Sequence, residues 1–292
     1  MMSRVIAIAV LLLVSTACKP SHKNSIVVGS KNFTEQLILS ELIAQQIENK
    51  THIPVERRFY LAGTYIAQQA MLAGRIDIYS EYTGTALTAI LKRAPEGSRE
   101  QVFTTVKDEY ARGFGFEVTP PFGFNDSFAI EIRGEDARRL HIHSISEAAQ
   151  YTPGWRAGFG YEFMERPDGF KGLVATYGLR FATAPRIMDL GLLTRALKDK
   201  QVDLIAGNNT DGLIPALDLF VLEDDRHYFP PYEAVPVVRQ EILARYPTVR
   251  TAINELAGKI SDQEMRQLNY AVDGQHRDPK QVVRDFRQRK GL

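Results

Sequence analysis

The sequence has few of the residues that support redox or nucleic-acid chemistry. Cys18 is the only cysteine among 292 residues, so no disulfide can form within the chain. Lys and Arg number 36 and Asp and Glu 35, which leaves a formal net charge of +1. Nucleic-acid-binding domains usually carry a basic surplus on one face. The only basic cluster lies in segment 284–290, where Asp285 interrupts it, and we interpret it as a solvated helix face.

Catalytic and metal-binding motifs are also missing. The six histidines are scattered, His141 and His143 are the only close pair, and no cluster has the spacing of a zinc site. There is no phosphate-binding loop and no Gly-x-Ser-x-Gly elbow, and Gly158-Phe159-Gly160 lacks the third glycine of a dinucleotide fingerprint. Carboxylates alone can still do acid–base work. We nevertheless expect a protein that is not an enzyme and that uses no metal or other cofactor.

Long apolar runs are absent beyond the N-terminus. Val5–Val14 follows Arg4 and is too short to span a bilayer, and Ser15-Thr16-Ala17 follows it. We therefore interpret residues 1–17 as a secretory signal peptide. Cys18 after small residues resembles the lipobox of bacterial lipoproteins, although Ser15 stands where leucine is usual. We expect lipid on Cys18, which would hold the protein at a membrane; ordinary cleavage that leaves a free thiol is the alternative.

Strand-like and helical patterns alternate in the first part of the mature chain. Asn32 and Glu35 have the spacing of a capping box, and the apolar residues from Leu39 to Ile47 fall on one helical face. A second helix is expected from Gly63-Thr64 to Gly74. The expected strands are Ile26–Gly29, Pro54–Tyr60 and Ile76–Tyr79. This βαβαβ order is typical of a mostly parallel sheet in an α/β protein.

A similar order returns later in the chain. Its expected elements are a capping box at Ser144 and Glu147, a strand at Gly154–Phe159, a helix at Asp189–Lys200, a strand at Val202–Ile205, and C-terminal helices starting at Thr248 and Ser261. The strands at 76–78 and 202–204 both run into loops that contain Thr and Gly. Ligands of open α/β sheets bind beyond the carboxyl ends of the strands. Two such ends facing each other would form a cleft between two lobes, unless the similarity is due to chance.

Aromatic residues gather in three turn-rich segments. These segments are Tyr79–Thr85, Phe122–Phe128 and Tyr228–Tyr232. A quaternary ammonium group has no N–H to donate, so proteins hold it against the electron-rich faces of aromatic rings. Any one of these rings could instead fill a core near a strand end; for the set, the family resemblance described next favours a binding role.

Several motifs in the correct order resemble the substrate-binding proteins of glycine betaine, carnitine and choline (osmoprotectant) ABC importers. The similarity extends over nearly the whole mature chain. The motifs are Gly29–Gln36, Ile76–Thr85, Arg166–Gly169 with Gly172-Leu173, Tyr177-Gly178, Leu222–Asp225 with Phe229–Tyr232, and Leu256–Ser261. The resemblance implies a two-lobed periplasmic-binding-protein fold of type II, in which ligand binds in the cleft and the lobes close about a hinge.

The resemblance also implies an organisation of the chain. Lobe I would contain residues 18–129 and 223–292, and lobe II residues 130–222, with crossings near Phe128–Glu131 and Val221–Asp225. The expected role is the extracytoplasmic, periplasmic component of an importer, which delivers its solute to permease and ATPase subunits. No nucleic-acid partner is expected.

Ligand-binding residues follow from the same resemblance. Tyr82 and Tyr232 match cage tyrosines, Thr85 matches a polar contact, and Asp126 matches a position occupied by Asp or Asn. Phe128 and Asn208 stand where tyrosines are expected, so one hydroxyl and one complete ring are missing.

Two further candidates are weaker. Lys31 lies in the opening motif, and Arg156 lies in an expected lobe II strand and could hold a carboxylate. Two alternatives remain open for the function as a whole. One is a larger or more polar betaine or an amino-acid-like ligand, which Asn208 favours, and the other is an enzyme on the same fold.

Overall fold

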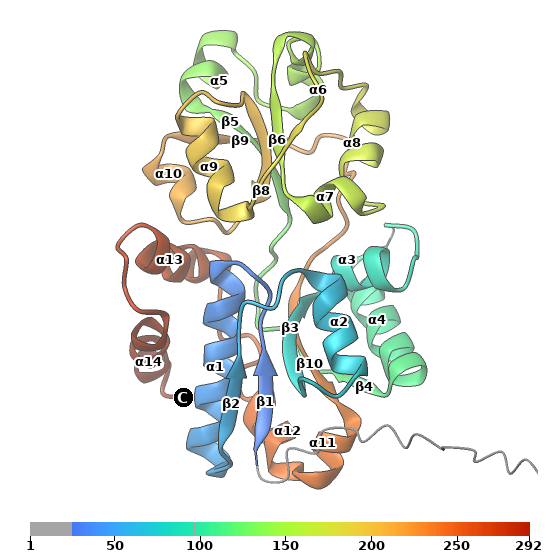
Figure 1. Ribbon diagram of the computed structural model, residues 1–292, viewed down its shortest axis with the longest axis vertical. Helices are drawn as coiled ribbons and strands as arrows, with labels where there is room; N and C mark the ends of the chain where they lie inside the picture. The colour runs from blue at the N-terminus through green and yellow to red at the C-terminus, as the bar shows by residue number, and fades with distance from the viewer. Residues whose placement is uncertain (1–24, 96) are drawn as a thin grey trace, which may run out of the picture.

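The computed structural model describes residues 25–95 and 97–292 and shows two lobes (Figure 1). Each lobe contains one five-stranded mixed sheet with helices around it. This confirms the expected two-lobed α/β fold. The signal peptide and Cys18 lie outside the described residues.

The sheet of lobe I takes strands from both ends of the described chain. Its strand order is β2-β1-β3-β10-β4. β1 is parallel to β2 and β3, whereas β10 is antiparallel to β3 and β4. The strands are β1 (Ile26–Gly29), β2 (Val55–Arg58), β3 (Ile78–Tyr82), β4 (Phe116–Val118) and β10 (Ala234–Arg239).

The sheet of lobe II has the same kind of mixed order, β7-β6-β8-β5-β9. β6 is parallel to β7 and β8, and β5 is antiparallel to β8 and β9. The strands are β5 (Phe128–Arg133), β6 (Ala157–Phe159), β7 (Arg186–Ile187), β8 (Leu204–Asn208) and β9 (Leu219–Leu222).

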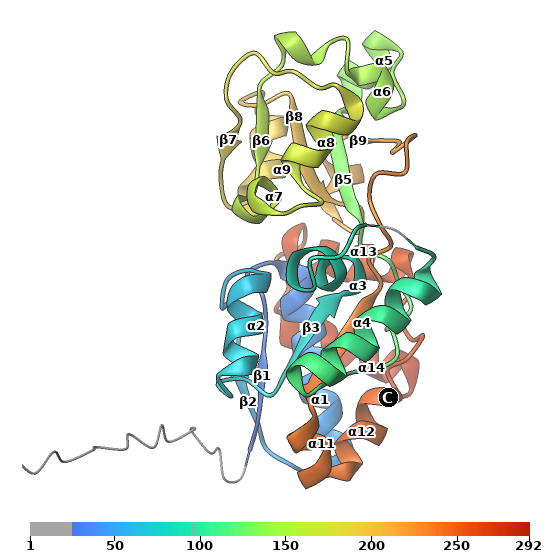
Figure 2. The same ribbon diagram turned by 90° about the vertical axis from the view of Figure 1, so that its right-hand side faces the viewer.

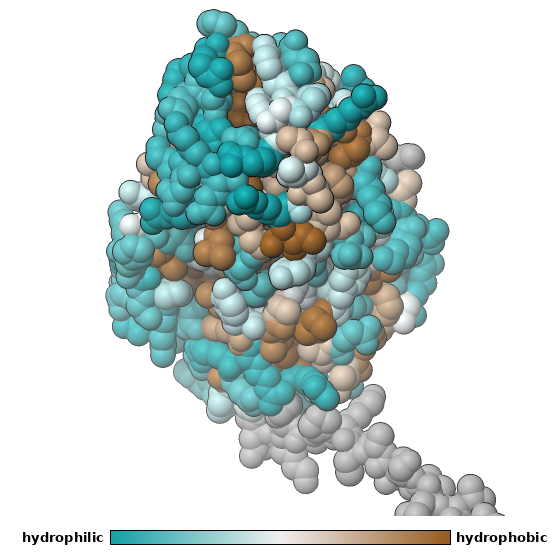
Figure 3. Space-filling model, turned by 45° about the horizontal axis from the view of Figure 1, so that its top comes forward, coloured by the Kyte–Doolittle hydropathy of each residue, from teal (hydrophilic) through white to brown (hydrophobic). Residues whose placement is uncertain are grey.

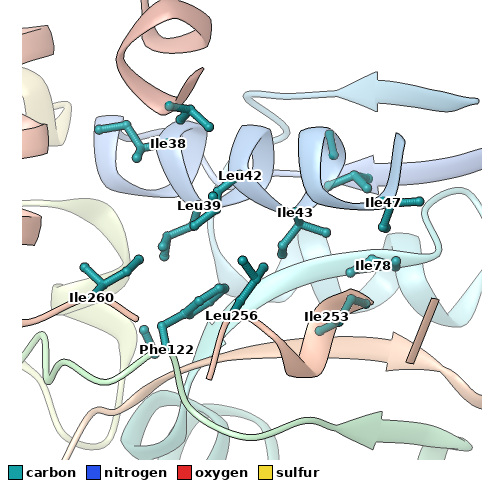
Figure 4. Packing of buried hydrophobic residues seen from close by; sticks show 14 of the residues in the cluster. Ile38, Leu39, Leu42, Ile43, Ile47, Ile78, Phe122, Ile253, Leu256 and Ile260 are labelled. Carbon is teal, nitrogen blue, oxygen red and sulfur yellow. The ribbon is translucent and has the colours of Figure 1, made fainter. Parts of the chain in front are cut away.

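Helices cover both faces of the lobe I sheet. On one face α1 packs between the strands and the C-terminal helices, and its apolar side chains fill the core with residues such as Phe122 and Ile253 (Figure 4). On the other face α2 and α4 enclose a second core around Tyr79. The elements are α1 (Thr34–Thr51), α2 (Thr64–Leu72), α3 (Thr83–Thr85) continued by a π-helical turn (Ala86–Ile90), α4 (Arg99–Phe114), α11 (Gln240–Arg245), α12 (Pro247–Asn254), α13 (Asp262–Asp273) and α14 (Pro279–Lys290).

Lobe II has shorter helices and two smaller cores. One core is rich in aromatic rings and lies around Phe159 and Phe163; the other lies between β8 and α9. The helices are α5 (Gly134–Leu140), α6 (Ile145–Ala148), a 3₁₀ turn (Thr152–Gly154), α7 (Tyr161–Glu165), α8 (Phe170–Tyr177), α9 (Leu190–Lys198) and α10 (Leu213–Ala216).

Two segments connect the lobes, one leading into β5 and one leading from β9 to β10 (Figure 2). They lie side by side, since the Asp126 backbone N–H donates to the Tyr232 carbonyl. At the expected first crossing, Phe128–Glu131, β5 begins with Phe128. Beyond the expected second crossing, Val221–Asp225, the Tyr228 hydroxyl donates to the Gly169 carbonyl of lobe II.

Most expected elements are present, but the cap of α1 and several strand boundaries differ. Capping boxes at Ser144 and Ser261 are confirmed, but Asn32 does not cap α1. The N-cap of α1 is Phe33 without a side-chain hydrogen bond, and Glu35 is turned into the protein. The third strand begins at Ile78 rather than Ile76, because the Asp77 carboxylate accepts a hydrogen bond from the Val27 N–H just before the strand.

Candidate functional site

A cavity of about 460 Å³ lies between the lobes at the ends of β3, β8 and the connecting segments. Lobe I contributes the loops after β1 and β2, and lobe II contributes α7, the start of α9 and the end of β8. The polar and charged residues around it are Lys31, Asn32, Thr64, Thr85, Asp126, Glu162, Arg166, Asp189 and Asn208. The aromatic residues are Phe33, Tyr65, Tyr82, Phe128, Tyr161, Phe163 and Tyr232.

Almost all of the residues expected from the sequence line this one cavity. These are Lys31, Tyr82, Thr85, Asp126, Phe128, Asn208 and Tyr232. Asn208 ends β8 directly opposite Phe128 of β5, and its side-chain amide makes no hydrogen bond within the described residues.

Arg156 is the exception. Its guanidinium pairs with Asp203, with Nε 3.0 Å from Oδ2, and it does not line the cavity. The buried guanidinium that does line the cavity is Arg166, which lies within one of the family-like motifs but was not expected as a site residue. Other large residues around the cavity, such as Tyr161 and Phe163 of α7, were not predicted from the sequence, because they lie in loops and short helices without a strong periodic pattern.

Tyr82 is fixed by a buried carboxyl group. Its hydroxyl donates to Glu35 Oε1 over 2.7 Å. Glu35 also accepts hydrogen bonds from the Thr210 hydroxyl (2.6 Å) and from the Asn269 amide (3.0 Å). Burial raises the pKa of Glu35, and these hydrogen bonds oppose the rise. Glu35 and Asn269 come from lobe I and Thr210 from lobe II, so the network joins the lobes.

Asp126 belongs to the same network. Its Oδ1 lies 2.7 Å from the Thr210 hydroxyl oxygen. Burial raises the pKa of Asp126 well above its ordinary value, and the neighbouring Glu35 raises it further. A second carboxyl group thus lies beside the first, and among the described residues no Lys or Arg forms an ion pair with either.

Tyr232 is fixed in a different way. Its hydroxyl donates to Asp168 Oδ2 over 2.5 Å, and Asp168 also accepts two hydrogen bonds from Arg166, of 2.9 and 2.5 Å. The guanidinium lies 4.9 Å from the centre of the Phe128 ring and 5.9 Å from that of Tyr232. Burial acts to raise the pKa of Asp168, but the Arg166 guanidinium keeps it below its ordinary value.

A second cavity of about 500 Å³ adjoins the first between α9–α10 and α13. The two cavities share Asn32, Phe33, Leu190 and Asn208. Tyr60 and Tyr270 line the second, as Ile66 and Tyr161 line the first, and all four side chains are exposed. Small apolar patches also break the hydrophilic surface in the region where the lobes meet (Figure 3).

Within residues 25–95 and 97–292, no group of His, Cys, Asp and Glu is arranged to hold a metal ion. Over the same residues, none of the helices combines the length and apolar character that crossing a membrane requires.

A two-lobed fold with a ring-lined cavity between the lobes defines a solute-binding protein. Comparison with known families specifies the class: residues 24–289 match the substrate-binding domain of ABC-type glycine betaine transport systems. The chain belongs to this family, whose members are transport proteins and not enzymes.

Relatives and solved structures agree with this assignment. The ergothioneine transport permease/ergothioneine binding protein EgtU of Helicobacter pylori is 34% identical over 98% of this chain, which spans only 52% of that relative. The carnitine transport binding protein OpuCC of Listeria monocytogenes is 34% identical, with 92% of this chain and 88% of the relative covered. The crystal structure of a glycine betaine/carnitine/choline ABC transporter protein matches with a TM-score of 0.76, 32% identity, and coverage of 91% of this chain and 99% of that one.

Proposed function

We propose that the protein captures a quaternary ammonium solute of the betaine, carnitine or choline class in the 460 Å³ cavity between its lobes. The observation that supports this most strongly is the ring of aromatic residues, to which both lobes contribute. A cation over an aromatic face gains up to about 2 kcal/mol when it is desolvated. The names of the relatives, which refer to carnitine, glycine betaine and ergothioneine, point to the same class.

We further propose that the preferred ligand is larger than glycine betaine. Asn208 leaves space where a ring would stand, and it lies where the two cavities join, so a longer ligand could extend past it. Its unpaired amide offers two donors and one acceptor to a polar group of that ligand. Carnitine-like compounds and amino-acid betaines with a ring fit this description, and ergothioneine is one of the latter.

Calorimetry on the wild type and on Asn208→Tyr tests this specificity. The substitution restores a ring, so it should strengthen glycine betaine binding by about twofold to thirtyfold, equivalent to about 0.5–2 kcal/mol. It should weaken carnitine or ergothioneine, whichever the wild type binds better, because the tyrosine fills their space. Tight binding of glycine betaine by the wild type, with both larger compounds excluded, would contradict the proposal.

We propose that the loaded protein docks on the permease of an ABC importer outside the cytoplasmic membrane, with ATPase subunits powering transport. Lipid on Cys18 would keep it near that permease. The intact mass of protein extracted from membranes should exceed that of the unmodified chain starting at Cys18 by a diacylglyceryl group. A soluble product with a free Cys18 thiol would reject the anchor but leave the binding role intact.

A further inference from the structure

The Thr210 hydroxyl lies between two carboxyl groups, 2.6 Å from Glu35 Oε2 and 2.7 Å from Asp126 Oδ1. Both separations are those of O–H···O hydrogen bonds. A hydroxyl has one hydrogen and can donate to only one of the two oxygens. The hydrogen of the other contact must therefore come from a carboxyl group, so this pair of acids holds a proton.

The surroundings of the two acids decide which one holds it. Glu35 receives three donors, from Tyr82, Thr210 and Asn269, and stands in the first turn of the 18-residue helix α1, where the helix dipole favours an anion. Asp126 receives the backbone N–H of Thr210 and shares the Thr210 hydroxyl, and its contact with the Glu35 carboxyl group raises its pKa further. The consistent arrangement is an Asp126 acid that donates to Thr210, whose hydroxyl donates to a Glu35 carboxylate.

We propose that Glu35, and not Asp126, supplies the negative charge that the cavity offers to a cationic ligand, with Asp126 held beside it as a neutral acid. This proposal rests on the proposed function. The charge acts through Tyr82, whose hydroxyl donates to Glu35 and whose ring lines the cavity. The Lys31 ammonium already lies 5.0 Å from the centre of that ring, as expected for an electron-rich face.

The other charged groups near the pair leave the assignment unchanged. Lys31 is paired with Glu81. Asp273 of α13 accepts the Thr34 hydroxyl over 2.6 Å, and Asp211 lies in the loop after β8. Both of these acids add negative charge near Glu35, which further disfavours ionisation of a second carboxyl group in the network. The direction of the pKa of Asp126, raised by burial and by Glu35, agrees.

Binding of glycine betaine, choline and carnitine to amide variants tests the charge assignment near pH 7. Asn in Asp126→Asn imitates a neutral acid and can still donate to Thr210, so each affinity should stay within about threefold of wild type. Glu35→Gln removes the anion and should weaken the tightest of the three by at least about tenfold. Asp285→Asn, an acid on the surface of α14 paired with Arg277, is the control and should have little effect. A larger loss for Asp126→Asn than for Glu35→Gln, or equal losses, would overturn the proposal.

A second measurement needs no ligand. An Asp126 that is neutral when folded and ionised when unfolded makes the folded state bind one more proton above about pH 4. The ratio of the wild-type folding constant to that of Asp126→Asn should therefore fall by about tenfold per pH unit, until Asp126 ionises in the folded protein. A ratio independent of pH above about pH 4 would show that the pair of acids holds no proton and would overturn the proposal. If the wild type binds none of the three compounds, the proposed function fails, while this arm still tests whether the pair of acids holds a proton.

Discussion

Two tyrosines of the cavity, Tyr82 and Tyr232, each donate a hydroxyl hydrogen bond to a buried carboxyl group, but the charges around the two carboxyl groups differ. Tyr82 donates to Glu35, which has hydrogen-bond donors but no ion-pair partner among the described residues, whereas Tyr232 donates to Asp168, which is neutralised by Arg166. Burial therefore raises the pKa of Glu35, while the guanidinium keeps that of Asp168 low. If the cavity binds a cation as proposed, the difference assigns the attraction to the carboxylate that the protein does not neutralise itself.

The largest effect should come from removing that internal cation. In Arg166→Met the apolar stem can still pack on Phe128, but Asp168 loses its partner while buried. Breaking a buried ion pair in this way costs about 3–5 kcal/mol. Urea unfolding should show this loss, and Arg250→Met, which breaks an exposed pair with Glu117, should cost about 0–1 kcal/mol. Equal losses would mean that Arg166 contributes no more than a surface residue.

The pH dependence of stability should distinguish acids that have no ion-pair partner from acids that have one. Burial raises the pKa of Asp211 to about 6, helped by the charges of Asp273 and Glu35. The unfolded carboxyl group ionises near pH 4, so the folded state keeps a proton that the unfolded state loses. The stabilisation is complete below pH 4 and is lost as the pH rises through 6, by at most about 3 kcal/mol.

Asp211→Asn should remove this loss when free energies of unfolding are compared between pH 4 and pH 7.

Asp203 provides the opposite case: burial acts to raise its pKa, but hydrogen bonds from Arg156 and Arg133 lower it to about 2. Its stabilisation is present above about pH 4 and is lost as the pH falls through 2. Asp203→Asn should therefore change the pH dependence of the free energy of unfolding only below about pH 4. The same pH profile for both variants would remove the distinction.

A smaller effect is expected on binding from the Tyr82 ring itself. Tyr82→Ala removes a desolvated face worth about 2 kcal/mol, so the tightest of glycine betaine, choline and carnitine should bind about thirtyfold more weakly. Circular dichroism should show that the variant is folded. Unchanged affinity in a folded variant would mean that Tyr82 is a core residue only.

The sequence predicted the residues of the cavity better than their electrostatic roles. Tyr82, Asp126 and Tyr232 were accessible to prediction because they lie in turn segments that follow apolar strands and match family motifs. Most helices and strands were also accessible, since local periodicity and capping residues mark them.

Contacts between residues far apart in the sequence could not be predicted in this way. Glu35 has the spacing of a capping residue, but its partners Tyr82, Thr210 and Asn269 lie 47, 175 and 234 positions away. Arg156 and Arg166 are chemically identical in the sequence, and only the fold places Asp203 beside one and a ring-lined cavity beside the other. No local pattern distinguishes an arginine held at the surface from one buried in a site.

The smallest expected effect, and the most selective test of the comparison, comes from removing the hydroxyl group of Tyr82 or of Tyr232. Tyr82→Phe leaves Glu35 one donor short, and no ion-pair partner within residues 25–95 and 97–292 compensates for it, whereas in Tyr232→Phe Asp168 keeps both hydrogen bonds from Arg166. A hydrogen bond to a charged group contributes about 1.5–3 kcal/mol, and more of it is lost when no other charge remains nearby. We expect Tyr82→Phe to weaken binding of the same ligand by about threefold to tenfold and Tyr232→Phe by less than about threefold. Equal losses in calorimetry, with both variants folded, would mean that Arg166 does not distinguish the two sides and that both carboxylates act on the ligand alike.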